Sequence, residues 1–288
     1  MPSSPSTRPW SRPAARASTS AVAEPPTSAL AEARPVPGDA YVQSFARGLG
    51  VIRSFSADAP RQTITQVATA TGLTRAGARR VLLTLQSLGY AATDGRLFWL
   101  TPKILDLGFS YLSSQPLWHL SEPIVEALVA RVKDSSSIAV LDGHEIVYML
   151  RVPTRKVMRV TLGAGSRLPA FSTSLGRTLL ADFDDDALRA LLQRHPPQAL
   201  TEHTLTDPDA LVAAVRQAKC QGFAVNDREL ETGLVSIAAP IYDRAGRTVA
   251  AINVGAAYAR DSIARLHDDV LPELLSAARD ISALLQRT

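Results

Sequence analysis

The segment 73–101 constrains the fold most, because one strongly amphipathic helix is followed there by a hairpin signal. Thr74 suits the N-cap of this helix, and Gly89 suits the position where it stops. Asp94-Gly95 then favours a two-residue turn between two short strands. The apolar residues recur at three- and four-residue spacing and form one stripe: Ala78, Val81, Leu82, Leu85 and Leu88.

Two shorter predicted helices precede this segment. The first carries an apolar stripe of Phe45, Leu49, Ile52 and Phe55 and ends before Asp58-Ala59-Pro60. The second is short, is capped by Thr65 and stops at Gly72. Three helices followed by a β-hairpin predict a winged helix-turn-helix over residues 41–101, and the front of the last helix is the part of such a motif that enters the DNA major groove.

The positive charge of the chain is concentrated in the same block. Residues 41–101 hold seven arginines and two aspartates, a formal charge of +5, whereas residues 1–40 sum to +1 and residues 102–288 to −2. An arginine-rich helix taken alone is most often a solvated face, but the order of elements and the local charge together favour double-stranded DNA as the partner. We expect the DNA contacts to come from Thr65, Gln66, Thr74, Arg75, Ala76, Arg79, Arg80 and Arg96.

The cysteine content and the lack of a long apolar run indicate where in the cell the protein acts. A single cysteine, Cys220, rules out an internal disulfide and fits a reducing compartment, so we expect a cytoplasmic protein. No apolar run approaches the roughly 18 residues that span a bilayer, so no membrane partner is expected. Residues 1–38 are rich in Pro, Ala, Ser and Arg without the apolar core of a signal peptide, which predicts a disordered tail outside the fold.

A helix opened by Thr101-Pro102 and ending near Pro116 follows the hairpin and carries apolar residues over a broad surface. It either belongs to a continuous core or is a linker packed on another subunit. We favour the linker, over residues 102–116, because winged-helix proteins commonly read two half-sites as dimers.

Residues 117–288 mix helices with a mostly antiparallel sheet, which predicts an α+β domain able to enclose a small ligand. Expected helices begin at the caps Ser121, Asp184 and Asp207, and the closing helix begins near Ser262 with a kink at Pro272. Expected strands flank Asp142-Gly143 and occupy residues 156–165, 223–227 and 235–257.

From about residue 41 to residue 285 the chain resembles the IclR family of transcription regulators. The resemblance is carried by TRAGARRVLLTLQSLGY, DGRLFWLTPKILDLGFSYLSS, RLPAFSTSLGRTLLA and GFAVNDRELETGLVSIAAPIYDRAGRTVAAINV. SSIAVLDGHEIVYMLRVPTRKVMRVTLGAGSRLPAFSTSLGR is similar in particular to the PcaR, PcaU and PobR sub-group, which controls aromatic-acid catabolism through the β-ketoadipate pathway.

The resemblance implies a winged helix-turn-helix, a linker helix and a GAF-like effector domain. It also implies a homodimer or a dimer of dimers, and a small carboxylic or aromatic acid as effector. The effector positions that it implies are Val157, Val160, Leu168, Ser174, Leu175, Gly176, Asn226, Ser236, Asn253 and Gly255.

The chemistry of these positions suits the binding of a carboxylic acid. Ser174 and the backbone N–H groups of Leu175 and Gly176 fall at an expected helix N-terminus, where a carboxylate is favoured. Some relatives carry Asp and Cys where this chain has Asn226 and Ser236, and the loss of one negative charge leaves both a dicarboxylate and an aromatic acid open. The alternative is that the polar residues only satisfy turns and strand edges.

An enzyme is the competing class. The five histidines show no metal-ligand spacing, and no G-x-S-x-G elbow or phosphate-binding glycine loop is present. Asp227, Glu229 and Glu231 alternate as metal ligands can, but a solvated acidic turn is the favoured interpretation, and Cys220 has no activating neighbour in the sequence. We therefore expect no enzyme, no metal and no cofactor; a winged helix joined to a metal-dependent or other enzyme, or one that binds only proteins, is the alternative.

Overall fold

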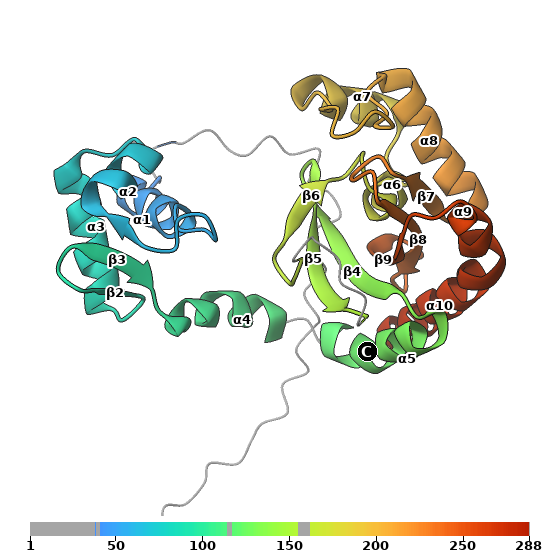
Figure 1. The fold of residues 1–288 in the computed structure, drawn as a ribbon, viewed down its shortest axis with the longest axis horizontal. Coiled ribbons are helices and arrows are strands. Elements are labelled where there is room, and N and C mark those ends of the chain that lie inside the picture. Colours follow the sequence, from blue (N-terminus) through green and yellow to red (C-terminus); the bar gives the residue numbers. More distant parts are fainter. Residues whose placement is uncertain (1–37, 39–40, 114–116, 155–161, 288) are drawn as a thin grey trace, which may run out of the picture.

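The computed structural model describes residues 38, 41–113, 117–154 and 162–287. They form two parts joined by a helix, with a small helical part on one side and a larger sheet with flanking helices on the other (Figure 1). Val157 and Val160 lie outside the described residues, as does most of the strand expected over residues 156–165. The described end of that segment, residues 162–165, is not a strand.

The smaller part is the winged helix-turn-helix that the sequence predicts. Its buried core joins all three helices and the hairpin through Val51, Val67, Leu82 and Phe98. Its elements are α1 (Gln43–Arg53), β1 (Gln62–Thr63), α2 (Ile64–Thr71), α3 (Arg75–Ser87), β2 (Ala91–Thr93) and β3 (Leu97–Leu100). The sequence did not predict β1, a two-residue strand that pairs with β3 across the hairpin.

Hydrogen bonds at the helix ends correct one expected cap and confirm two. Thr63, and not Thr65, caps α2, because the Thr63 hydroxyl accepts the N–H of Gln66 while the Gln66 side chain accepts the N–H of Thr63. The Thr74 hydroxyl accepts the N–H of Gly77 at the start of α3, as expected. Gly89 has a φ of +82°, the left-handed conformation that ends a helix.

The expected apolar stripes are only partly buried. Phe45 and Leu49 of α1 are 67% and 43% exposed, because this helix reaches the core through Val51 near its C-terminal end. Leu88 is 54% exposed, because α3 ends one residue earlier and the chain then leaves the helical path.

The linker begins with a short 3-10 turn (Pro102–Ile104) and continues as α4 (Leu105–Ser113). Thr101 does not cap this turn with its side chain, since its hydroxyl donates to the carbonyl of Gly89 at 2.6 Å. Lys103 Nζ donates to the carbonyl of Leu88 at 2.9 Å. These two contacts join the start of the linker to the C-terminal end of α3.

The larger part is built on a six-stranded antiparallel sheet within the described residues, in the order β6-β5-β4-β9-β8-β7. Helices α5 and α10 cover one face, and α6, with α7 and α8 outside it, covers the other (Figure 1). The strands are β4 (Ser135–Asp142), β5 (Glu145–Val152), β6 (Arg167–Pro169), β7 (Ala224–Asp227), β8 (Leu234–Tyr242) and β9 (Thr248–Ala257). The helices are α5 (Leu117–Val132), α6 (Ser174–Leu180), α7 (Asp185–Arg194), α8 (Pro208–Gln221), α9 (Ser262–Arg265) and α10 (Leu271–Arg287).

Two expectations for these helices are corrected and two are confirmed. Ser121 lies inside α5 and its hydroxyl donates to the carbonyl of Leu117, a common way for a buried helical serine to be satisfied. A π-helical stretch (Leu266–Val270) separates α9 from α10, so the irregularity comes just before Pro272. Asp184 and Asp207 cap α7 and α8 as expected.

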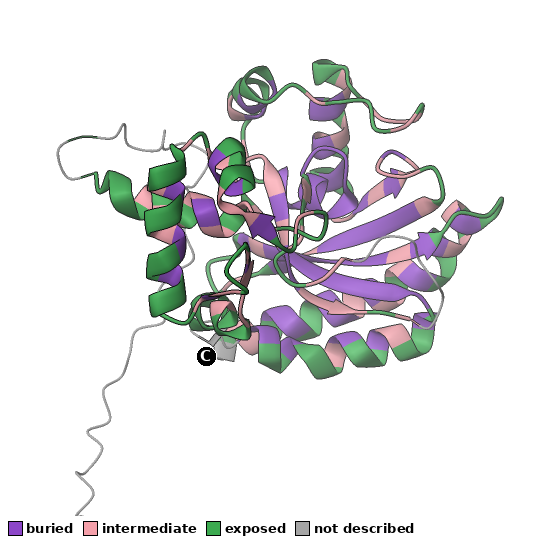
Figure 2. Ribbon diagram, turned by 60° about the vertical axis from the view of Figure 1, so that its left-hand side comes forward, coloured by how far each residue is buried: buried purple, intermediate pink, exposed green. Residues whose placement is uncertain are grey.

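Burial differs sharply along the chain. Figure 2 shows the central strands buried between their helical layers, while much of the winged-helix part is exposed. Every residue of α6 is buried, whereas Leu105 and Phe109 of α4 are 70% and 62% exposed. In the described part of the chain, no helix is long and apolar enough to cross a membrane.

Candidate nucleic-acid interface and ligand pocket

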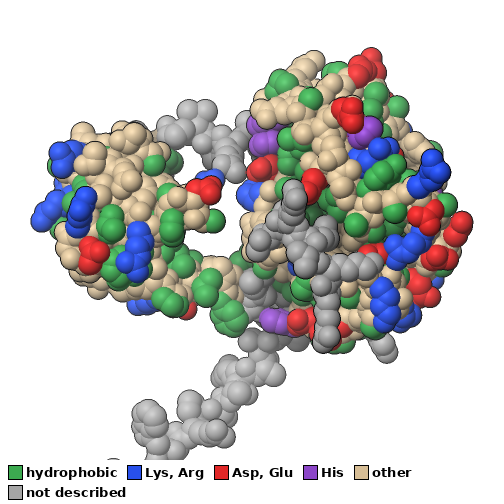
Figure 3. Space-filling view, viewed as in Figure 1, with side chains coloured by type: hydrophobic (Ala, Val, Ile, Leu, Met, Phe, Trp, Pro, Cys, Tyr) green, Lys and Arg blue, Asp and Glu red, His purple; other side chains and the backbone are tan. Residues whose placement is uncertain are grey.

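The front of α3 presents a cationic face. Arg75, Arg79 and Arg80 are all exposed, while Ala78 and Leu82 on the other side of the helix are fully buried. Lys and Arg side chains gather on the side of the winged-helix part where α3 lies (Figure 3). This face can meet an anionic groove without disturbing the core behind it.

The other predicted contact residues surround this face. Thr65, Gln66, Thr74 and Ala76 are exposed at the starts of α2 and α3. The side chains of Gln66 and Thr74 already take part in helix caps. The N-termini of both helices therefore have fixed orientations, which suits them to position a phosphate backbone.

The wing turn is fixed by its own aspartate. The Asp94 carboxylate accepts the N–H groups of Arg96 and Leu97, and these hydrogen bonds, that of Leu97 first, hold the pKa of Asp94 below its ordinary value. Since the N–H of Asp94 donates to the carbonyl of Leu97, the turn is centred on Gly95 and Arg96, one residue later than expected. Arg96 is exposed at its tip.

Sequence reasoning missed Arg61. Its guanidinium lies 4.4 Å from the centroid of the Trp99 ring, a cation–π contact on the wing sheet. The two residues come together only because β1 pairs with β3, and no local pattern in the sequence signals that pairing.

A cavity of about 320 Å³ lies between the sheet and the start of α6. This volume is at the lower end of the range for small-molecule sites. Seven of the implied effector positions line it: Leu168, Ser174, Leu175, Asn226, Ser236, Asn253 and Gly255. Ser174, Asn226, Ser236 and Asn253 are each at most 8% exposed, so the polar groups of the cavity are held inside the domain.

Gly176 does not line this cavity. A Cβ atom at this position would lie 2.0 Å from the carbonyl oxygen of Ala170, so glycine is required for the close approach of α6 to that segment. The N–H of Gly176 is taken by the Thr173 hydroxyl, which caps α6 at 3.0 Å. In this structure the N–H group expected to receive a carboxylate is therefore already bonded to the fold.

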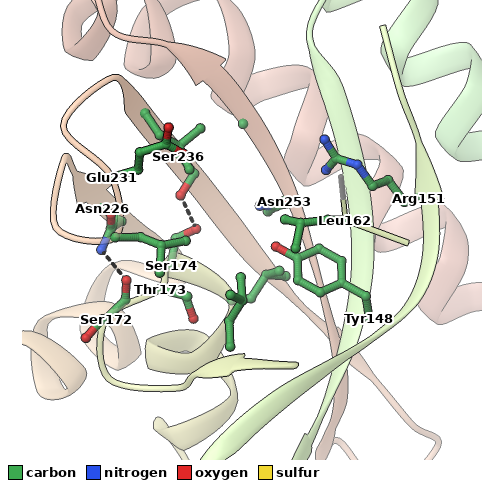
Figure 4. Close-up of a pocket in the computed structure, with 15 residues that line it drawn as sticks. Tyr148, Arg151, Leu162, Ser172, Thr173, Ser174, Asn226, Glu231, Ser236 and Asn253 are labelled. Atoms are coloured by element: carbon green, nitrogen blue, oxygen red, sulfur yellow. Dashed lines mark hydrogen bonds between the residues drawn. The ribbon is translucent and has the colours of Figure 1, made fainter. Parts of the chain in front are cut away.

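The polar residues of the pocket are also bonded to the fold (Figure 4). The Ser174 and Ser236 hydroxyls lie 2.8 Å apart, and Asn226 Nδ2 donates to the carbonyl of Ser172 at 3.0 Å. Asn253 Oδ1 accepts the N–H of Ser137. Structural satisfaction and a place on the pocket wall thus coexist in the same side chains.

Tyr148 and Arg151 of β5 line the pocket and were missed by sequence reasoning. Burial raises the pKa of Tyr148 to about 12, so its phenol is protonated and can donate a hydrogen bond at neutral pH. Arg151 Nη1 donates to the Ser137 hydroxyl at 3.1 Å. The rest of the lining is Leu162, Ser172, Thr173, Leu230, Glu231 and Leu234.

The three carboxylates of the acidic turn have different surroundings, and Glu229 is buried, not solvated as the sequence led us to expect. Glu229 makes a buried two-pronged ion pair with Arg177 of α6, with both N–O distances at 2.6 Å. Asp227 pairs with Arg228, and Glu231 lines the pocket. Among the residues that the structure describes, no group of three or more His, Cys, Asp or Glu side chains could hold a metal ion.

A winged helix with a cationic recognition helix, joined to a domain whose pocket has apolar walls and a few buried polar groups, is typical of a ligand-responsive transcription regulator. Residues 44–95 match the IclR helix-turn-helix domain, and residues 109–283 match the C-terminal domain of the bacterial transcriptional regulator IclR. The chain belongs to the IclR family of transcriptional regulators.

Two characterised relatives are of the Pca and Pob type. The Pca regulon regulatory protein of Pseudomonas putida is 43% identical over 242 residues, which is 84% of this chain and 83% of that protein. The p-hydroxybenzoate hydroxylase transcriptional activator of Acinetobacter baylyi is 35% identical over 250 residues, 85% of this chain and 92% of that protein.

Two solved structures of similar proteins have the same fold. A putative transcriptional regulator from Rhodococcus sp. RHA1 is 50% identical with a TM-score of 0.77, over 85% of this chain and 98% of that one. The inducer-binding domain of a PobR double mutant from Acinetobacter, solved with 3-hydroxybenzoic acid, is 29% identical with a TM-score of 0.55, over 58% of this chain and 98% of that one.

Proposed function

We propose that this regulator binds its operator as a homodimer or a dimer of dimers and that a small aromatic acid, bound in the pocket beside α6, sets its affinity for DNA. The observation that carries the proposal is the convergence of Ser174, Asn226, Ser236 and Asn253 on one cavity, although they lie on four different elements. The proposed organisation is a winged helix over residues 41–101, a linker over 102–116 and an effector domain over 117–288. Residues 1–38 lie outside it, and the site of action is the cytoplasm.

On the DNA side, at least one of Arg75, Arg79 and Arg80 reads a guanine edge in the major groove, and the others contact phosphate. Thr65, Gln66, Thr74 and Ala76 complete the contacts of the two helix N-termini. Arg96 reaches the backbone or the minor groove from the wing. Exposure of all these side chains supports the assignment.

On the effector side, the relatives favour an aromatic acid over an aliphatic dicarboxylate. One relative is named for p-hydroxybenzoate hydroxylase, and the PobR inducer-binding domain was solved with 3-hydroxybenzoic acid. The walls supplied by Leu162, Leu168 and Leu175 suit the faces of a ring.

The proposed dimer rests on the exposed apolar surface of the linker. Leu105, Leu107 and Phe109 of α4 are each 49% to 70% exposed. Exposed apolar surface of this kind is unfavourable in water unless another surface buries it. The linker of a second copy of the chain would bury it symmetrically.

Effector-dependent operator binding by a pocket variant tests the proposal. Sequencing of genomic DNA captured by the purified protein gives the operator, and its affinity is then measured with and without 4-hydroxybenzoate or 3-hydroxybenzoate. Ser174→Leu fills the pocket beside α6 and is expected to abolish the response while acid-free operator binding stays normal. Gln193→Leu, on the exposed side of α7, is the matched control and responds like the wild type. A normal response in Ser174→Leu, with a melting curve like that of the wild type, would place the effector elsewhere.

A further inference from the structure

A β-bulge brings Tyr148 and Arg151 to the same side of the sheet. In a regular strand two residues three apart point to opposite faces. Here the pairing of β4 with β5 shifts between Ile138 and Ala139, so that Tyr148 pairs with Ala139 and Arg151 pairs with Ser137. One extra residue is thereby accommodated in β5.

The packing of the two intervening residues agrees with the bulge. Met149 and Leu150 both pack into the core on the α5 and α10 side of the sheet. Tyr148 packs with the core on the α6 side, and both Tyr148 and Arg151 line the pocket there. The irregular strand therefore delivers a cation and a protonated phenol to one end of the cavity.

The opposite end of the cavity has different chemistry. Figure 4 shows Ser174, Ser236, Asn226 and Glu231 across the pocket from Tyr148 and Arg151. Hydroxyls and an amide can both donate to and accept from a ligand hydroxyl, whereas a carboxylate only accepts. The pocket thus has a cationic end and an end that accepts hydrogen bonds and carries negative charge.

We propose that this polarity selects a hydroxylated aromatic monocarboxylate, with its carboxylate held at Arg151 and Tyr148 and its ring hydroxyl at Ser174, Ser236 and Glu231. The proposal rests on the function proposed above and deepens it by fixing the orientation and the class of the acid. Glu231 repels a second carboxylate at the hydroxyl end, so dicarboxylates of the same length are rejected.

The reversed orientation is disfavoured by α6 itself. This helix is only seven residues long, and the N–H of Gly176 is already bonded to its cap. Although Arg151 Nη1 also donates to Ser137, its guanidinium carries a full positive charge, so it is a stronger partner for a carboxylate than the end of a short helix.

Calorimetric titration of the full-length protein with three matched ligands tests the orientation. The ligands are 4-hydroxybenzoate, the uncharged 4-hydroxybenzamide and the dicarboxylate terephthalate. The wild type is expected to bind 4-hydroxybenzoate at least about tenfold more tightly than the other two, since a charge-assisted contact is worth at least that factor. A wild type that prefers terephthalate overturns the proposal without any variant.

Two variants separate the ends of the pocket. Arg151→Gln is expected to weaken the binding of 4-hydroxybenzoate by about 10- to 100-fold and to leave the binding of 4-hydroxybenzamide unchanged. The control is Arg247→Gln, at the exposed β8–β9 turn, which is expected to change the affinity for neither ligand. Glu231→Gln is expected to strengthen the binding of terephthalate by about tenfold, because the repelling charge is removed. Equal weakening of the acid and the amide by Arg151→Gln would show that Arg151 only shapes the pocket, and terephthalate binding unchanged by Glu231→Gln would remove the charge selection.

The same titration distinguishes the two proposals. Tight 4-hydroxybenzoate binding that does not depend on Arg151 overturns the orientation and leaves the proposed effector class standing. A wild type that binds no aromatic acid, and whose operator complex is insensitive to all of them, overturns both.

Discussion

The winged-helix part and the effector domain assemble their sites differently. The candidate DNA contacts lie between Thr65 and Arg96, on consecutive elements, and all are exposed. The pocket draws residues from β5 to β9, between Tyr148 and Gly255, and its polar members are mostly buried. The first site depends on charge on a small local scaffold, whereas the second depends on strand register and on buried polar partners.

This difference predicts how each site fails. The winged helix has its own small core, separate from the two cores of the effector domain. Surface changes on α3 should therefore alter DNA affinity without unfolding anything, while changes around the pocket should alter stability and ligand binding together.

The largest effect is expected from the buried ion pair behind the pocket. Glu229→Gln leaves the guanidinium of Arg177 buried without its counter-charge, which costs about 3–5 kcal/mol of unfolding free energy. Glu229 also accepts the N–H of Leu205, so the loop beside the pocket loosens as well. Denaturant unfolding is expected to show the loss in the effector domain only, with the winged helix unchanged.

Glu202→Gln is the matched control, because the Glu202 side chain is 80% exposed. Equal losses in the two glutamate variants would show that the buried pair with Arg177 adds nothing to stability. A loss shared by the winged helix would show that the two parts unfold as one unit.

The arginines at the front of α3 should give the largest effect on DNA. Arg75→Ala combined with Arg79→Ala is expected to cost about 1–3 kcal/mol of operator affinity for an arginine that reads a base. For an arginine that neutralises a phosphate, the salt slope, which is the dependence of the logarithm of the DNA affinity on the logarithm of the salt concentration, is expected to fall by about one. The acid titration of this variant should match the wild type. Arg47→Ala combined with Arg53→Ala, two exposed arginines on α1 of the same part, is the charge-matched control. Normal operator binding by the double variant would place another element in the groove.

The sequence predicted the two regions to different depths for physical reasons. Caps, glycine stops and Asp-Gly turns are local, so the winged helix and most helices of the effector domain follow from short patterns. The three-residue interval between Tyr148 and Arg151 predicts opposite faces, and only the bulge in β5 reverses this. The pairing of Arg177 with Glu229 across 52 residues left no local signal either.

A smaller effect is expected at the wing. Arg96→Ala is expected to weaken all DNA sequences alike and to lower the salt slope by about one, because we propose that the exposed Arg96 at the tip of the wing contacts phosphate. Operator and scrambled DNA measured over a range of salt concentrations check this. A changed base preference at an unchanged slope would instead mean that the wing reads sequence directly.

The smallest effect is a pH dependence confined to the effector domain. All five histidines lie outside residues 41–101, so the winged helix has no histidine to titrate. The His144 and His195 rings stack at 3.7 Å between the β4–β5 turn and the end of α7. Desolvation first, then the charges of His144 and Arg194, lower the pKa of His195 below 6.5, and Glu145 opposes them.

The unfolded chain therefore binds more protons than the folded one between that lowered pKa and 6.5, so this stabilisation is present above pH 6.5 and is lost as the pH falls. His195→Asn is expected to flatten the difference in effector-domain stability between about pH 5.5 and about pH 7.5, with His119→Asn, an exposed histidine on α5, as control. The winged helix should show no difference over the same range. An unchanged pH profile in His195→Asn would mean that the stacked pair does not couple protonation to folding, and a pH-dependent winged helix would break the separation between the two regions.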